Sequence, residues 1–80
     1  MSVKADETLD LRGLKCPLPA LMAKRAIVRS AYGNVVEVIC DDPLAHIDVP
    51  HMCRDENIEV LHQEREGDVI RLWLRRSSLP

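Results

Sequence analysis

The sequence predicts an α+β fold: a two-layer β-α-β-α-β-β sandwich with a four-stranded mixed sheet and both helices on one face. Short β-branched segments alternate with two helical segments, and only a short turn separates the last two strands. Right-handed crossovers would place both helices on the same side of the sheet. With 80 residues, of which 46% are hydrophobic, we expect a single domain over residues 1–80 with a core of about 8–75.

The first half of the chain predicts a strand and a helix. Thr8 to Leu11 is expected to form a short strand. A helix is expected from Pro17 to about Ala31, with Gly33 as its C-terminal cap. At ~100° per residue, small and apolar side chains form one stripe that can lie close to the sheet: Ala20, Ala23, Ile27 and Ala31.

The middle of the chain predicts a strand followed by a second helix. In "NVVEVICDD", alternation places Val36, Val38 and Cys40 on one face of a strand. The next segment, "DDPLAHIDVPHMCRDEN", predicts a helix with Asp42 as its N-cap and a proline at its first position. Pro50 lies inside this helix, where we expect a kink or a division into two short pieces.

The last part of the chain predicts a β-hairpin. Its strands are expected at residues 58–65 and 69–75, joined by the turn "EGD". In the second strand, alternate side chains face inward: Ile70, Leu72 and Leu74. The side chains between and after them lie on the opposite face of the sheet, which we expect to be largely open: Arg71, Trp73 and Arg75.

Composition and charge argue against several classes of function. The 11 basic and 13 acidic residues give a formal net charge of -2, so we expect no direct contact with nucleic acid, which usually needs a strongly basic surface. No segment approaches the ~20 apolar residues of a membrane span, so we expect no membrane association and a cytoplasmic location. The three cysteines are odd in number and lack C-x-x-C spacing, which leaves at least one free thiol.

Cys16 is the leading candidate for chemistry because it directly precedes the first predicted helix. Pro17 suits the first helical position and Pro19 the third, since neither position needs an N–H for helical bonding. Unpaired N–H groups and the positive end of the helix dipole would then point toward the sulfur, and Arg12 and Lys15 add positive charge nearby. We therefore expect a lowered pKa and a reactive thiolate at Cys16. The alternative is that this cysteine is only a small N-cap residue.

The solvated side of the same helix predicts a docking patch for another protein. Leu18, Leu21 and Met22 extend along this side toward the thiol, and Arg25 and Arg29 follow them. Apolar side chains with no obvious core to enter, beside a reactive thiol, are typical of an interaction site. Packing against the second helix or the "DDP" loop is the alternative, above all for Met22.

Other candidate sites are weaker. A metal site could be assembled on paper from four residues of the second helical segment: His46, Asp48, His51 and Cys53. Their spacing matches no recognised zinc pattern and a proline interrupts them, so we expect no metal. Both remaining cysteines are expected to pack as small hydrophobic residues. Asp41 and Asp42 could have a role beside the thiol if their loop faces it.

A resemblance to a known family adds to this interpretation. "LDLRGLKCPLPALMAKRAI", Leu9 to Ile27, resembles the L-D-x-R-G-x-x-C-P-x-P signature of the TusA/SirA family of small sulfur-carrier proteins. The similarity continues through "VICDDPLAHIDVPHMC" and covers about residues 8–75. It implies the same β-α-β-α-β-β fold, and a Cys16 that carries sulfane sulfur as a persulfide. The motif residues that carry over with it are Arg12, Gly13, Pro17 and Pro19.

The resemblance also implies partners. A cysteine desulfurase or a rhodanese-type protein would load the carrier, and a downstream sulfur-acceptor protein would receive the sulfur, as in the tRNA 2-thiouridine relay, molybdenum-cofactor synthesis or sulfur oxidation. The protein would act stoichiometrically, without a cofactor of its own, and we expect a monomer. Two other classes stay open: a thiol-based redox or regulatory module, and an RNA-binding module, for which Trp73 is the one aromatic residue on the open sheet face.

Overall fold

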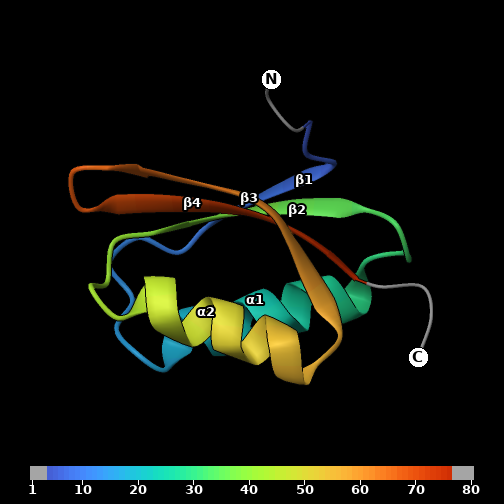
Figure 1. Cartoon of the computed structure of the whole chain (residues 1–80), viewed down its shortest axis with the longest axis horizontal. Coiled ribbons are helices and arrows are strands. Elements are labelled where there is room, and N and C mark those ends of the chain that lie inside the picture. The colour runs from blue at the N-terminus through green and yellow to red at the C-terminus, as the bar shows by residue number, and fades with distance from the viewer. Residues whose placement is uncertain (1–3, 77–80) are drawn as a thin grey trace.

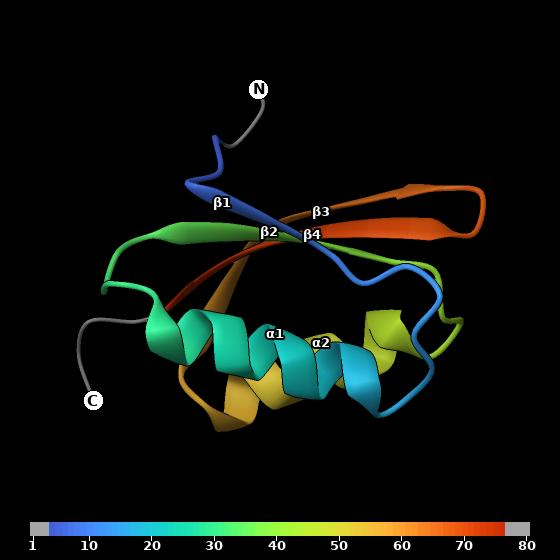
Figure 2. The same cartoon turned by 180° about the vertical axis from the view of Figure 1, so that it is seen from behind.

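The computed structural model describes residues 4–76 and has the predicted element order. The elements are β1 (Glu7–Asp10), α1 (Leu18–Arg29), β2 (Val35–Cys40), α2 (Ala45–Asp55), β3 (Ile58–Glu66) and β4 (Val69–Arg76). The strands form one four-stranded sheet in the order β1-β2-β4-β3. β1 runs parallel to β2, and the other two pairings are antiparallel. Both helices lie under the same face of this mixed sheet (Figures 1 and 2), so the predicted fold class is confirmed.

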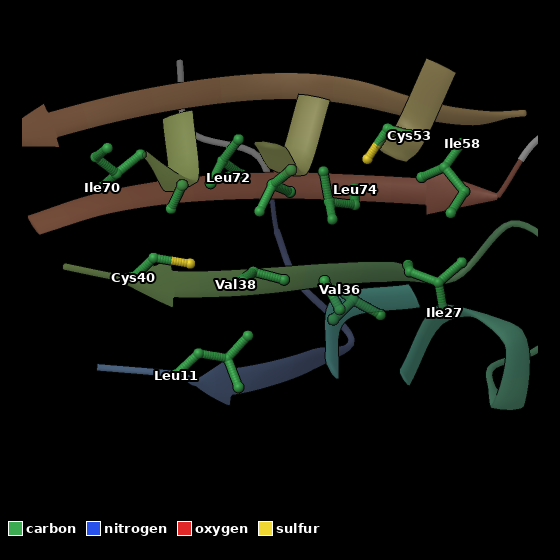
Figure 3. Packing of buried hydrophobic residues seen from close by; sticks show 13 residues of the cluster. Leu11, Ile27, Val36, Val38, Cys40, Cys53, Ile58, Ile70, Leu72 and Leu74 are labelled. Carbon is green, nitrogen blue, oxygen red and sulfur yellow. The ribbon is translucent and has the colours of Figure 1, made fainter. Parts of the chain in front are cut away.

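The hydrophobic core lies between the sheet and the helices. Val36 pairs with Leu74 and Val38 pairs with Leu72 across β2 and β4, and all four side chains are fully buried. Figure 3 shows them packed with apolar side chains from both helices. Burying a side chain of this size stabilises the fold by about 1.5–3 kcal/mol, so the predicted inward faces of these two strands account for much of the stability.

α1 packs on the sheet through small residues, as expected, but on a slightly different stripe. Its buried residues are Pro19, Ala23, Ala26 and Ile27. Ala31 is exposed and lies outside α1, because the N–H of Ser30 closes the last turn on two carbonyls and the chain then becomes extended. The helix therefore ends at Arg29, and Ala26 is buried against the sheet where Ala31 was expected.

α2 differs from the sequence-based expectation in two respects. It is not divided into two short pieces but is one continuous helix with Pro50 inside it, and the buried Val49 and Cys53 on either side of that proline pack into the core. This packing holds the helix together where proline removes one backbone hydrogen bond. Leu44, and not Asp42, is the N-cap residue. The Asp42 side chain makes a different contact, described below, that stabilises a neighbouring loop.

The sheet face opposite the helices is covered partly by its own side chains. Trp73 lies on this face as predicted but is only 7% exposed, because the His62 ring lies against it with 5.1 Å between ring centroids. Glu37 forms an ion pair with Arg71 at 3.1 Å on the same face. The tryptophan therefore offers little free ring surface. Neither helix within residues 4–76 is long and apolar enough to cross a membrane.

Candidate functional site around Cys16

Cys16 lies in the loop between β1 and α1, and its side chain is exposed. β1 and β2 are parallel neighbours, so the loops that follow their carboxyl ends lie at the same edge of the sheet. In α/β sheets this edge is where binding sites commonly form. The β2–α2 loop, which contains Asp41 and Asp42, thereby comes to lie beside the cysteine.

Two aspartates of the β2–α2 loop hold the cysteine loop in place. The N–H of Gly13 donates to Oδ1 of Asp41 at 2.9 Å, and the N–H of Cys16 donates to Oδ2 of Asp42 at 3.0 Å. Gly13 has a φ of +89°, a left-handed conformation that favours glycine. Asp42 is only 6% exposed, so its carboxylate is fixed in the structure. The role beside the thiol that the sequence left open for these aspartates is therefore a backbone contact.

The helix terminus offers Cys16 fewer N–H groups than expected. α1 begins at Leu18 with Pro17 as its N-cap, so the cysteine lies one residue before the cap, joined to Pro17 by a cis peptide bond. The N–H of Leu18 is already bonded to the carbonyl of Lys15 at 2.8 Å, and Pro19 at the second helical position has no N–H. Pro19 is also fully buried, so it anchors the turn instead.

The sulfur of Cys16 contacts a carboxylate. Sγ donates a hydrogen bond to Oδ2 of Asp48, in the first turn of α2, at 2.5 Å. This bond, together with partial desolvation and the negative charges of Asp48 and Asp42, raises the pKa of the Cys16 thiol above its ordinary value. The prediction of a lowered pKa is therefore wrong, because the carboxylates of Asp48 and Asp42 raise the pKa of the thiol and neither expected cation offsets them.

One of the two expected cations, Arg12, is paired with a carboxylate of β1. The guanidinium of Arg12 pairs with Asp10 at 2.8 Å and, through hydrogen bonds, lowers the pKa of that carboxyl to about 2. Lys15 is exposed. Arg12 therefore stabilises the start of the loop rather than a sulfur anion. The sequence gives the charges of these residues but not their partners.

The predicted docking patch is largely exposed. Leu18 and Leu21 are 43% and 50% exposed, and Arg25 is exposed further along α1. Met22 does not belong to the patch: it is half-buried against the core, because it lies one turn before Ala26 on the packed side of the helix.

A shallow groove on α1 extends the patch away from the cysteine. It is lined by Leu21, Lys24, Arg25, Val28 and Arg29. Val28, 53% exposed, is an apolar member that the sequence analysis missed. Its spacing of seven residues from Leu21 places it on the same helical face and could have revealed it. We call Leu18 and these five residues the α1 groove.

Cys16 is the one surface thiol of the chain's three. Cys40 and Cys53 are 0% and 1% exposed in the core, as the sequence predicted, and burial raises their pKa values to about 11 and about 12. Within the described part of the chain, no group of three histidine, cysteine or acidic side chains is arranged to hold a metal ion. The chemistry of the site therefore centres on one accessible sulfur.

Comparisons with known proteins found a family model, a similar sequence and a similar solved structure. A family model described as "Sulfurtransferase TusA" matches residues 7–76. The chain is 36% identical over 73 residues to the sulfur carrier protein TusA of Pseudomonas entomophila, and the match covers 91% of each chain. The crystal structure of a SirA-like protein from Desulfitobacterium hafniense is similar with a TM-score of 0.73 and 26% identity, over 86% of this chain and 95% of that one.

Proposed function

The chain belongs to the TusA family, and on that premise we propose that it carries sulfane sulfur as a persulfide on Cys16. A cysteine desulfurase or a rhodanese-type protein would be the donor, and another sulfur-acceptor protein, as in the tRNA 2-thiouridine relay, would take the sulfur onward. We also propose that the protein is a single domain that acts as a cytoplasmic monomer without direct contact with nucleic acid. The observation that carries it is the single surface thiol, held in a loop by backbone hydrogen bonds to Asp41 and Asp42.

Loading is a displacement between two sulfur atoms. The Cys16 sulfur, after losing its proton, attacks the outer sulfur of the donor's persulfide. A new S–S bond forms to Cys16 while the donor's S–S bond breaks. The electron pair of the broken bond stays on the donor cysteine, which leaves as a thiolate and takes up a proton. The neutral sulfur atom moves from one thiol to another, so no external oxidant or reductant is consumed.

The structure gives less support to the two alternatives. A redox module working within one chain needs a second thiol to resolve the oxidised cysteine, and both other thiols are in the core. An RNA-binding module that uses its open sheet face needs exposed aromatic rings on which bases can stack, and Trp73 on that face is covered by His62.

We propose that the donor docks on the α1 groove. Leu18, Leu21 and Val28 would supply its apolar centre, and the cations Arg25 and Arg29 its rim. The positive rim fits a donor that presents acidic side chains around an apolar contact. The groove starts at the first residue of α1, two residues after Cys16, so a protein bound there can reach the sulfur.

The test is loading followed by intact-mass measurement. After incubation with a pyridoxal-phosphate cysteine desulfurase and cysteine, the wild-type protein should gain the mass of one sulfur atom, and a thiol reductant should remove it. Cys16→Ser should keep the fold and gain nothing. Cys40→Ala and Cys53→Ala are the matched controls and should load normally. A folded wild-type protein that is loaded neither by a desulfurase nor by a rhodanese-type donor would contradict the proposal.

A further inference from the structure

The contact between Cys16 and Asp48 brings together residues from two parts of the fold. Their hydrogen bond joins the β1–α1 loop to α2 across 32 positions of sequence. α2 is anchored on both sides of Asp48 by the fully buried Ala45 and Val49. The carboxylate is therefore held against the sulfur by a packed helix, and its place does not depend on a flexible loop.

The charged groups around the sulfur are mostly negative. Asp48 approaches from α2, and Asp42, on the β2–α2 loop, is fixed by the backbone N–H of Cys16. The cations of the cysteine's own loop are Arg12, which pairs with Asp10, and Lys15, which is exposed.

The two helices also carry basic side chains. On α2, His51 lies 3.8 Å from the Asp55 carboxylate, and buried Nδ1 of His46 has no hydrogen-bond partner. On α1, Lys24 pairs with Glu56. Among residues 4–76, no cation forms an ion pair with Asp48. The Asp48 carboxylate thus has the Cys16 thiol as its hydrogen-bond donor.

We propose, on the basis of the function proposed above, that Asp48 is a positioning residue for sulfur transfer: it holds the unloaded Cys16 as an oriented, protonated thiol. A carboxylate that accepts the S–H proton stabilises the thiol and opposes a negative charge on the sulfur. Because the thiolate is the nucleophile, the free carrier reacts slowly with small thiol-directed reagents. The raised pKa of Cys16 agrees with this role.

The same hydrogen bond gives the proton a place to go during loading. When the donor's persulfide reaches Cys16, the S–H proton passes to Oδ2 of Asp48 and the electron pair of the S–H bond stays on the sulfur. That pair forms the new S–S bond, and the proton on Asp48 is then available to the leaving donor thiolate. The step balances without any further reactant, and the return of the proton assists a leaving thiolate but not a leaving group, such as iodide, that takes up no proton.

Asp48→Asn tests this role because it keeps the size of the side chain and removes its charge. The rate of alkylation by iodoacetamide is measured against pH for the wild type and the variant. In the variant the midpoint should move to lower pH, and alkylation at neutral pH should become several-fold faster. Loading by a cysteine desulfurase should not increase by the same factor, since the variant has lost its proton acceptor.

Asp55→Asn is the matched control, because it removes the same charge from the same helix seven positions away, where the carboxylate faces His51. Its alkylation profile should match that of the wild type. An unchanged midpoint in Asp48→Asn would overturn the proposal, and so would loading that accelerates as much as alkylation. The alkylation arm needs no sulfur donor, so it reports on Asp48 even if the wild type fails to load, which would count against the carrier function instead.

Discussion

Replacing Leu21 by aspartate separates docking from folding. Leu21 is 50% exposed, and full burial of a leucine contributes about 1.5–3 kcal/mol, so the half that is buried contributes about 1 kcal/mol. The lower helix propensity of aspartate adds at most about 0.7 kcal/mol. For a domain of this size, each kcal/mol lowers the thermal midpoint by about 4–8 °C. Leu21→Asp should therefore be folded at 25 °C but less stable.

Leu21→Asp should affect the rate of loading more strongly than it affects the stability of the fold. A desolvated apolar anchor at the centre of an interface contributes about 2 kcal/mol or more, which corresponds to about 30-fold weaker binding of the donor. At donor concentrations below saturation, the rate of persulfide formation on Leu21→Asp should fall by about the same factor. Alkylation of Cys16 by iodoacetamide should be normal, because the sulfur itself is unchanged.

Val60→Asp is the matched control for Leu21→Asp. Val60 is an apolar residue of β3, 36% exposed and outside the α1 groove, so this variant adds the same charge and should load normally. Circular dichroism gives the thermal midpoint, and a mass time course gives the loading rate. Unfolding of Leu21→Asp at 25 °C would show that Leu21 belongs to the core. A folded Leu21→Asp that loads at the wild-type rate would show that the donor binds elsewhere.

Two further predictions concern charge. Arg25→Glu should slow loading more at low salt than at 1 M salt, because the Debye length falls from about 10 Å at 0.1 M to about 3 Å at 1 M. A loading defect that does not depend on salt would exclude a screened contact at the rim of the interface. Stability should fall as pH rises above about 9, because the pKa values of Cys40 and Cys53 are raised to about 11 and about 12, so the unfolded chain loses these protons first. In urea titrations, each thiol should lower the free energy of unfolding by about 1 kcal/mol between pH 8 and pH 10. The free energy of unfolding of Cys53→Ala should fall less with pH than that of the wild type. An equal fall in the two proteins would refute this cause.

The fold could be predicted from the sequence because its signals are local. Alternation in β2 and β4, a proline-opened helix and a short hairpin turn each act within a few residues, and the core follows from them. Cys16 could be found for the same reason. Its environment could not, because Asp42 and Asp48 reach it across 26 and 32 positions. The helix dipole and the nearby cations, which are local features, therefore predict the wrong direction for the shift of the thiol pKa.

The position of Met22 shows that a small rotation of a helix changes which side chains are predicted to be exposed. Its hydrophobicity fits both a docking patch and a core, and a rotation of the helix by one residue decides between them. Met22 packs against the core because it lies one turn before the buried Ala26. Val28 was missed for the same reason, because it lies on the side that the rotation exposes.

The burial of the other two thiols has a consequence for how long a loaded carrier keeps its cargo. A persulfide is lost when another thiol attacks its inner sulfur, forms a disulfide with it and expels the outer sulfur as hydrosulfide. Cys40 and Cys53 are tethered to the same chain but are buried in the core between the sheet and the helices (Figure 3), so neither can attack while the core is intact. Leakage within a single molecule then requires the core to open. Under the proposed function, loss of the undelivered sulfur to the chain's own thiols is thus limited by the rate at which the core opens.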